Sequence, residues 1–204
     1  MVVLENLQVI GFDGALRGMR NPKDSWKRSD SHYADGRFII GENDKGLMLR
    51  LAKAGSEHRK YLRMIHVQFD LTLPIYVWSE MDTYKVGVTR DSRSFMHKGM
   101  VKEFELSDFT YNEEMIDSLK DVIKDLNKLR EKYLETKDFE VFVAIRDLLP
   151  SGYNLKATLD MNYENILNIY RQRYNHRLKE WRDLCEMFKE QVPLMSDIID
   201  SING

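Results

Sequence analysis

The stretch MIHVQFDLTLPIYVWSEMDTYK, residues 64–85, decides the fold. From Ile65 to Leu73, apolar residues alternate with polar ones, which is the two-residue period of a strand that buries one face. Pro74 ends this pattern, and proline is well tolerated in the first turn of a helix. We therefore predict a strand that leads directly into a helix over residues 74–85.

The polar segment that follows, residues 86–98, is dense in groups that could bind an anion. Together with Lys85 it provides Arg90, Ser92, Arg93, Ser94, His97 and Lys98. Cations and hydroxyls at this density suit phosphate or carboxylate. A solvated surface loop is the simpler interpretation, because Lys, Arg and Ser are mostly exposed in proteins.

Periodicity elsewhere predicts a mixed fold of strands and long helices. We predict strands over residues 2–10 and 155–161, a helix with Arg17 and Arg20 that Asp13 caps, a helix that Asn43 or Asp44 caps and Gly55 ends, helices over 112–132 and 138–149, and one long final helix from 162 to about 191. Residues 21–38 lack periodicity, which predicts a mobile loop that could act as a lid.

The composition is that of a single domain with its own core. The chain has 204 residues, 43% hydrophobic and 31% charged, so we predict one domain over residues 1–204. With 31 basic and 33 acidic residues, the net charge of −2 gives no global attraction to nucleic acid or an anionic membrane. We find no membrane span of about 20 apolar residues and no signal peptide, so the cytoplasm is the expected compartment.

The cysteine and histidine content gives no indication of disulfide or metal chemistry. Cys185 is the only cysteine, and its neighbours Trp181, Leu184 and Phe188 indicate a small core residue. No histidine pair has metal-ligand spacing, so we predict no catalytic metal. The glycine-rich loops of Rossmann and P-loop nucleotide sites are also missing from the sequence.

Some side chains in the predicted helices have both an ordinary and a functional interpretation. Arg173 follows apolar residues at helical spacing, so it lies near a buried edge where a cation needs an anionic partner, either a protein carboxylate or a ligand. Asn162 stands at a strand-to-helix junction, where capping is the simpler role. Tyr84, Trp78 and Tyr170 could stack on a planar ligand, although aromatics at this spacing are more often core residues.

Three segments in the first half of the chain resemble one known family, the flavin-dependent thymidylate synthases (ThyX). ALRGMRNPKDSW, residues 15–26, resembles the early helix of the family. AKAGSEHRKYL, residues 52–62, resembles the segment that meets the flavin. Residues 73–98 are similar to the strand end and helix that lead into the motif RHRxxSxNExSxRY, and Lys85 and Asp91 keep the expected charge at their positions.

A fourth segment, near the C-terminus, resembles the NxRxxxNFxxxR helix of the same family. It is NYENILNIYRQR, residues 162–173, and His176 follows it. Asn162, Asn168 and Arg173 are in register with the motif, and Glu164 stands where the family has its first arginine. The four segments occur in the family's order along most of the chain.

The resemblance implies an α+β, ThyX-like single domain, with a small, mostly antiparallel sheet packed against long helices. It implies reductive methylation of dUMP to dTMP in nucleotide biosynthesis, with hydride from reduced FAD and carbon from methylene-tetrahydrofolate. It also implies a cytoplasmic homotetramer that binds small molecules. An inactive or repurposed homologue that binds a nucleotide or a flavin, or an interaction scaffold, is the alternative.

The same resemblance assigns roles to individual residues. Arg173 would be catalytic, because it would contact and polarise the pyrimidine. The flavin would be held by Ser56, His58, Lys85, Asn162, Asn168 and His176. The nucleotide would be held by Arg90, Ser92, Arg93 and Ser94, together with Arg173.

Overall fold

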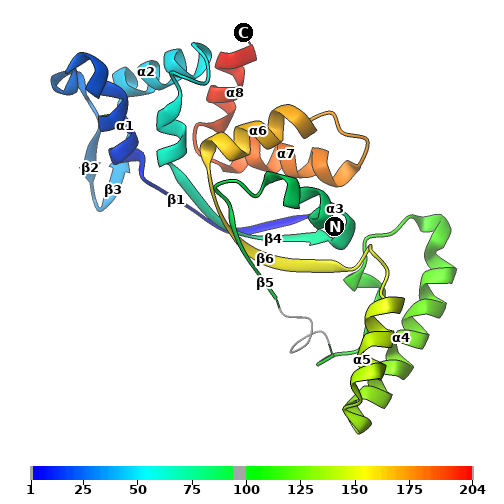
Figure 1. The fold of residues 1–204 in the computed structure, drawn as a ribbon. Coiled ribbons are helices and arrows are strands. Elements are labelled where there is room, and N and C mark those ends of the chain that lie inside the picture. The colour runs from blue at the N-terminus through cyan, green and yellow to red at the C-terminus, as the bar shows by residue number, and fades with distance from the viewer. Residues whose placement is uncertain (1, 94–99, 204) are drawn as a thin grey trace. The chain divides into compact units, whose positions relative to one another are not determined.

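The computed structural model describes residues 2–93 and 100–203 and contains two small antiparallel sheets with several helices (Figure 1). One sheet has the strand order β1-β4-β6-β5, formed by β1 (Val3–Ile10), β4 (His66–Pro74), β6 (Asn154–Asn162) and β5 (Thr89–Ser92). The other pairs β2 (His32–Ala34) with β3 (Arg37–Ile39). The helices are α1 (Phe12–Arg20), α2 (Glu42–Lys53), α3 (Ile75–Met81), α4 (Ile116–Thr136), α5 (Phe139–Leu148), α6 (Tyr163–Arg173), α7 (Lys179–Gln191) and α8 (Met195–Asn203). The predicted α+β class is confirmed.

The strand and helix predicted over residues 64–85 are present. The apolar residues of β4, from Val67 to Leu73, are buried at every second position, as the alternation requires. Pro74 is the N-cap of α3, which ends at Met81 and continues into a single 3₁₀ turn, Asp82–Tyr84. This turn delivers Tyr84, which is 8% exposed, to the interior.

The chain divides into two compact units. The first contains Met1–Val3, Leu71–Thr83 and Asp91–Ala157. The second contains Leu4–Asp70, Tyr84–Arg90 and Thr158–Gly204. Because β4 and β6 each contribute residues to both units, the single domain predicted from the sequence stays a prediction.

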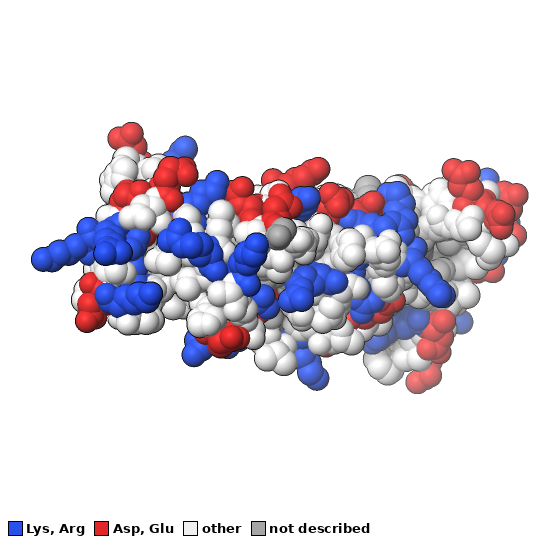
Figure 2. Space-filling view, turned by 90° about the horizontal axis from the view of Figure 1, so that it is seen from above, with Lys and Arg blue, Asp and Glu red and all other residues white. Residues whose placement is uncertain are grey.

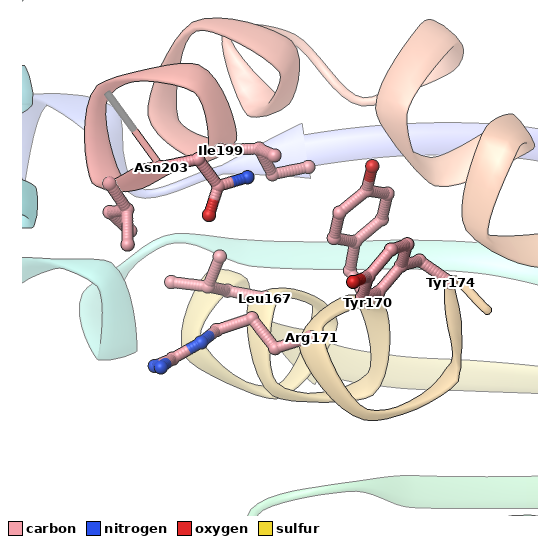
Figure 3. A pocket seen from close by; sticks show the side chains of 7 residues that line it. Leu167, Tyr170, Arg171, Tyr174, Ile199 and Asn203 are labelled. Atoms are coloured by element: carbon pink, nitrogen blue, oxygen red, sulfur yellow. The ribbon is translucent and has the colours of Figure 1, made fainter.

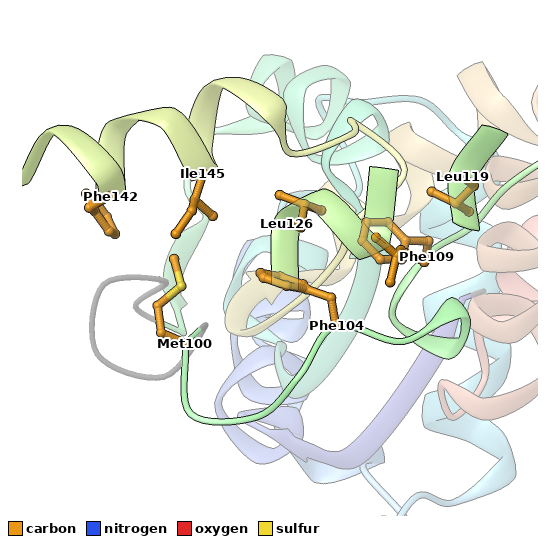
Figure 4. Close-up of a cluster of buried hydrophobic side chains, with 8 residues drawn as sticks. Met100, Phe104, Phe109, Leu119, Leu126, Phe142 and Ile145 are labelled. Atoms are coloured by element: carbon orange, nitrogen blue, oxygen red, sulfur yellow. The ribbon is translucent and has the colours of Figure 1, made fainter. Parts of the chain in front are cut away.

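The core of the first unit is a cluster of apolar side chains on α4, α5 and the segment before them (Figure 4). Leu126 on α4 and Ile145 on α5 are fully buried. Phe104 and Phe109 complete the cluster with ring centroids 6.5 Å apart. The predicted amphipathic helices over 112–132 and 138–149 are therefore confirmed, and α4 begins four residues later than its predicted start, after a 3₁₀ turn at Glu113–Met115.

In the second unit, α6 and α7 lie side by side (Figure 1), and α7 packs on β4. Phe69 of β4 and Phe188 of α7 form an edge-to-face pair with ring centroids 5.7 Å apart. Trp181 and Cys185, also on α7, are fully buried. The prediction that Cys185 is a core residue is thus confirmed.

Residues 21–38 are not the irregular loop that the sequence predicts. They contain two 3₁₀ turns, Asn21–Lys23 and Trp26–Arg28, followed by β2 and most of β3. Asp44 holds this segment, because its buried carboxylate accepts hydrogen bonds from Nε of Arg20 at 2.6 Å and from the hydroxyls of Ser29 and Ser31, each at 2.6 Å. Hydrogen bonds to a residue distant in sequence hold this segment, rather than burial of a regular apolar face, so its structure leaves no periodicity in the sequence.

The predicted helix caps are corrected by the structure. Gly11, not Asp13, is the N-cap of α1, and Gly41 is the N-cap of α2. Asp30 instead serves α2, since its carboxylate oxygens accept hydrogen bonds from the backbone N–H groups of Asn43 at 2.8 Å and of Asp44 at 3.0 Å. The Asp30 carboxylate therefore satisfies the backbone N–H groups at the start of α2, a capping role that was predicted for Asn43 or Asp44.

The predicted final helix is interrupted. Helix α6 ends at Arg173 and α7 begins at Lys179, so residues 174–178 form a bend, and α8 follows α7. At the bend, Nη1 of Arg182 donates hydrogen bonds to the backbone oxygens of His176 at 2.6 Å and Arg177 at 2.9 Å. In a continuous helix these carbonyl groups would accept hydrogen bonds from the backbone, and at the bend they accept them from Arg182 instead.

Basic and acidic side chains are both spread over the face shown in Figure 2. This mixture agrees with the near-neutral net charge of −2. Among the helices of the described residues, none has the length and apolar character needed to cross a membrane.

Candidate functional site

Arg173, at the last position of α6, is joined to Tyr84 by a hydrogen bond. Nε of Arg173 donates to the Tyr84 hydroxyl over 2.8 Å, and the guanidinium carbon lies 5.6 Å from the centroid of the Tyr84 ring. Tyr84 is the last residue of the 3₁₀ turn Asp82–Tyr84. The arginine is half-buried, so its orientation is set by these contacts.

Two residues that follow α6 in the chain, His176 and Trp181, also contact the Arg173 guanidinium. Its carbon lies 4.7 Å from the centroid of the buried Trp181 ring, a cation–π contact. Its Nη1 lies 2.9 Å from Nε2 of His176. The backbone nitrogen of Leu178 lies 3.3 Å from Nδ1 of the same ring. The bend between α6 and α7 is therefore what brings His176 to Arg173.

A side-chain relay extends from Arg173 along α6. The Tyr84 hydroxyl donates to Oε1 of Gln172 at 3.0 Å, and Nε2 of Gln172 donates to Oδ1 of Asn168 at 2.9 Å. Asn168 and Gln172 are four residues apart and share a helix face. Asn168, Arg173 and His176, which the sequence singled out separately, thus belong to one connected group, which we call the Arg173 cluster: Tyr84, Asn168, Gln172, Arg173, His176 and Trp181.

The beginning of α6 is fixed by Asn162 and Asn165. The Asn162 side chain accepts from the backbone N–H of Asn165 at 3.0 Å, and the Asn165 side chain accepts in return from the Asn162 N–H, which confirms the capping role of Asn162. Nδ2 of Asn165 donates to the backbone oxygen of Val86 at 2.9 Å. The segment that carries Lys85 is thereby attached to both ends of α6, and the Lys85 side chain is exposed.

The turn with Ser56 and His58 is attached to the same helix through Arg59. Nε and Nη2 of Arg59 donate to the carboxylate of Glu164 at 2.9–3.0 Å, and the Arg59 side chain is only 10% exposed. Ser56 is exposed, and the His58 side chain is 54% exposed, with Nε2 3.7 Å from the Glu57 carboxylate. The predicted flavin residues therefore lie on α6, on the bend that follows it, or on segments bonded to it.

Two of the predicted phosphate residues occupy a strand rather than a loop. Arg90 and Ser92 lie in β5, and Arg93 follows it with its backbone N–H bonded to the Lys156 oxygen at 3.0 Å. All three side chains are exposed. Ser94, like the nearby His97 and Lys98, lies outside the described residues. A role for these residues in nucleotide binding stays a prediction.

Of the three aromatic residues considered for ring stacking, only Tyr84 belongs to the Arg173 cluster. Trp78 is a core residue whose Nε1 donates to the Leu155 oxygen at 3.0 Å, and Tyr170 lines a separate cavity. Gln172 and Trp181 were not predicted as site residues. The four-residue spacing from Asn168 could have indicated Gln172, because residues at this spacing share a helix face. Nothing in the sequence indicates Trp181 as a site residue.

The cluster is suited to holding a planar, electron-rich ligand. The guanidinium of Arg173 is directed by a phenol and an imidazole, and two aromatic rings lie beside it. A guanidinium in fixed orientation binds carboxylate, phosphate or conjugated carbonyl oxygens well. In the described part of the chain, residues 2–93 and 100–203, no three His, Cys, Asp or Glu side chains are grouped to hold a metal ion.

Comparison with known proteins identifies the fold. No protein-family model matches the sequence, and no curated protein does. Among solved structures, the ThyX flavin-dependent thymidylate synthase of Helicobacter pylori, complexed with FAD and dUMP, matches with a TM-score of 0.73 and 17% identity, over 97% of this chain and 96% of that one. The UMP/dUMP methylase PolB of Streptomyces cacaoi, bound with 5-Br dUMP, matches with a TM-score of 0.64 and 12% identity, over 99% and 93%. This chain has the ThyX fold, as its sequence segments predicted.

Proposed function

We propose that this protein is a ThyX-like flavoprotein that binds FAD and a pyrimidine deoxynucleotide, and that it methylates dUMP reductively to dTMP. The observation that carries the proposal is the Arg173 cluster. Arg173 occupies the position that the family resemblance gives to the pyrimidine contact, and the structure surrounds it with Tyr84, His176 and Trp181. Solved proteins of the same fold have FAD and dUMP, or 5-Br dUMP, bound.

In this proposal Arg173 binds the uracil carbonyl edge and stabilises the negative charge that develops on the ring. The contacts of Nε with Tyr84 and of Nη1 with His176 fix the plane of the guanidinium that would face the base. A preoriented donor costs little reorganisation when charge develops, which is why fixed donors contribute strongly to catalysis. Arg90, Ser92, Arg93 and Ser94 would bind the nucleotide phosphate, since cations and hydroxyls are suitable donors.

The side chains around α6 fit a flavin dinucleotide in their chemistry. Ser56, His58 and Lys85 are exposed hydroxyl, imidazole and ammonium groups that could bind its phosphates, and Asn168 and His176 offer amide and imidazole groups to its ring system. Asn162 already caps α6, so any contact it makes with the flavin is additional to that role. When bound, FAD would supply the hydride, and methylene-tetrahydrofolate the carbon.

Glu164 sets this chain apart from the pattern that it resembles. Its carboxylate is neutralised by a bidentate contact with Arg59, in which Nε lies 3.0 Å and Nη2 2.9 Å from Oε1. The pair therefore places no unbalanced negative charge beside the predicted flavin residues. Removing Arg59 would expose that charge, and we expect it to weaken binding of an anionic cofactor.

The decisive experiment measures flavin retention and then nucleotide affinity. The purified protein is incubated with FAD and desalted, and its visible absorbance is recorded. We expect one flavin per chain, and dUMP is then titrated by calorimetry into the wild type, Arg173→Ala and Arg171→Ala. The last variant serves as the control, because Arg171 is another arginine of α6 that is exposed and does not belong to the cluster.

Loss of about tenfold or more in dUMP affinity on Arg173→Ala alone would support the proposal, since a charged hydrogen bond typically contributes this much. A colourless protein would contradict flavin-dependent catalysis. Flavin retention and dUMP binding without dTMP formation would favour the repurposed homologue. No binding of either ligand, with Arg173→Ala altering only stability, would favour a scaffold.

A further inference from the structure

Helices α6 and α8 enclose a cavity of about 270 Å³ that is separate from the Arg173 cluster (Figure 3). Leu167, Tyr170, Arg171 and Tyr174 recur at spacings of three and four residues, so they share one face of α6 and its end. Asn168, Gln172 and Arg173 fall outside that face. Ile199 and Asn203 of α8 line the other wall.

Two stacked tyrosines form one end of the cavity. The rings of Tyr170 and Tyr174 have centroids 5.7 Å apart and an interplanar angle of 16°. Tyr170 is only 8% exposed, yet its hydroxyl has no hydrogen-bond partner within residues 2–93 and 100–203. Among the described residues, the only buried side-chain nitrogen or oxygen without a partner is Nδ2 of Asn154, so the Tyr170 hydroxyl is open to the cavity, where it can pair with a polar group of a ligand in place of water.

A cation and an amide lie toward the other end. Figure 3 shows Asn203 and Arg171 on the side away from the two rings. Arg171 is exposed and forms no ion pair or hydrogen bond with side chains of the described residues. Lys189, Glu186 and Asp200 lie near Tyr170 but do not line the cavity, and Lys189 is 3.8 Å from Asp200. Among the residues that line the cavity, Arg171 is the only one with a charged side chain.

The floor between these ends is apolar. Leu167 and Ile199 are 1% and 2% exposed, so they form a closed apolar base beneath the cavity. At about 30 Å³ for each water, the volume corresponds to about nine waters, which suits one six-membered ring with two substituents rather than a dinucleotide.

We propose that this cavity binds a small aromatic carboxylate with a polar group at the opposite end of its ring, in the manner of a hydroxybenzoate. The ring lies over Leu167 and Ile199, the carboxylate is bound by Arg171 and Asn203, and the polar group pairs with the Tyr170 hydroxyl. This site is independent of the proposed function, because no residue of the Arg173 cluster lines it.

The test uses three probes that differ by one group each: 4-hydroxybenzoate, benzoate and 4-hydroxybenzamide. Binding is measured by calorimetry and by ligand-observed NMR on the wild type, Tyr170→Phe and Arg171→Gln. We expect 4-hydroxybenzoate to bind once per chain and the uncharged amide about tenfold more weakly. Arg171→Gln should remove that difference.

Tyr170→Phe keeps the ring and removes only the hydroxyl, so the variant is expected to fold. It should weaken 4-hydroxybenzoate about fivefold and leave benzoate unchanged, because only the first probe has a group for the hydroxyl to meet. Equal affinities for all probes, or no saturable binding, would overturn the proposal. So would loss of binding in Arg173→Ala, because the probe would then occupy the Arg173 cluster.

Discussion

The hydroxyl of Tyr84 accepts a hydrogen bond from Nε of Arg173 at 2.8 Å while it donates one to Gln172 at 3.0 Å. A single phenol thus fixes the guanidinium that is proposed to bind the pyrimidine. The hydroxyl accepts from Arg173 and donates to Gln172, so it serves both side chains at once. Tyr84 is a positioning residue in this arrangement, since it acts through Arg173.

We expect Tyr84→Phe to lower dUMP affinity about tenfold while the protein stays folded, because the ring still packs against Trp181 and only the hydrogen bonds are lost. Calorimetric titration of dUMP gives the affinity, and thermal unfolding verifies the fold. Tyr111→Phe, an exposed tyrosine outside the cluster, is the matched control. Unchanged affinity in Tyr84→Phe would show that Arg173 does not need the phenol.

Asp44 gives a prediction about acid stability. Burial raises the pKa of its carboxyl, but hydrogen bonds from Ser29, Ser31 and Arg20 and the Arg20 charge lower that pKa further, so it lies below its ordinary value. A carboxyl with a lowered folded pKa stabilises the protein above its unfolded pKa of about 3.9 and loses this contribution as the pH falls through the folded pKa. We expect stability to decline below about pH 4.

Asp44→Asn should destabilise the protein by about 3–5 kcal/mol at neutral pH, because it leaves the buried Arg20 without its anionic partner. The same variant should show a weaker acid dependence below about pH 4. Urea unfolding at several pH values measures both effects. Asp125→Asn, at an exposed ion pair with Lys128, is expected to change the unfolding free energy little. A wild-type-like Asp44→Asn would contradict the assigned role.

Cys185 is predicted to be inert in the folded protein. Its side chain is fully buried on α7, and burial raises the pKa of its thiol to about 12. Since the thiolate is the reactive form, a thiol reagent at about pH 8 should modify the chain only after unfolding. With an aromatic disulfide as the reagent, the absorbance of the thiolate that it releases measures the rate of Cys185 modification, first without and then with denaturant. Rapid stoichiometric reaction of the native protein would show that α7 opens readily.

The sequence predicted local elements well where one residue pattern determines the structure. The alternation of β4 and the amphipathic spacing of α4 each follow from burial of one face. The interruption between α6 and α7 was missed because residues 174–178 contain neither proline nor glycine. The bend depends on Arg182, which bonds backward to the oxygens of His176 and Arg177, and such a bond has no sequence signature.

The candidate site was predictable residue by residue but not as an arrangement. Arg173, Asn168 and His176 were identified from the resemblance, and Tyr84 as one of several aromatic residues. Their connection depends on a contact between residues 89 positions apart. The Arg59–Glu164 pair spans 105 positions and was missed for the same reason. Contacts of this range depend on how β4, α3 and α6 come together, which periodicity does not report.

Gly11 and Gly36 provide a matched pair for testing backbone strain. Both have positive φ, +94° and +73°, so alanine at either position adopts a left-handed conformation that costs roughly 1–2 kcal/mol. They differ in their surroundings. A Cβ at Gly11 would collide with the backbone oxygen of Met64, whereas nothing lies within 4 Å of a Cβ at Gly36. Backbone cannot move aside as a flexible side chain can.

We therefore expect Gly11→Ala to lower the free energy of unfolding by at least about 1–3 kcal/mol more than Gly36→Ala, because it adds overpacking to the same conformational cost. Urea unfolding of the two variants measures the difference. The collision is at the start of α1, which carries Arg20 to Asp44, so Gly11→Ala should also weaken the order of the β2–β3 hairpin in hydrogen exchange. Equal losses in the two variants would mean that Gly11 is required only for its φ angle and that α1 does not pack closely on Met64.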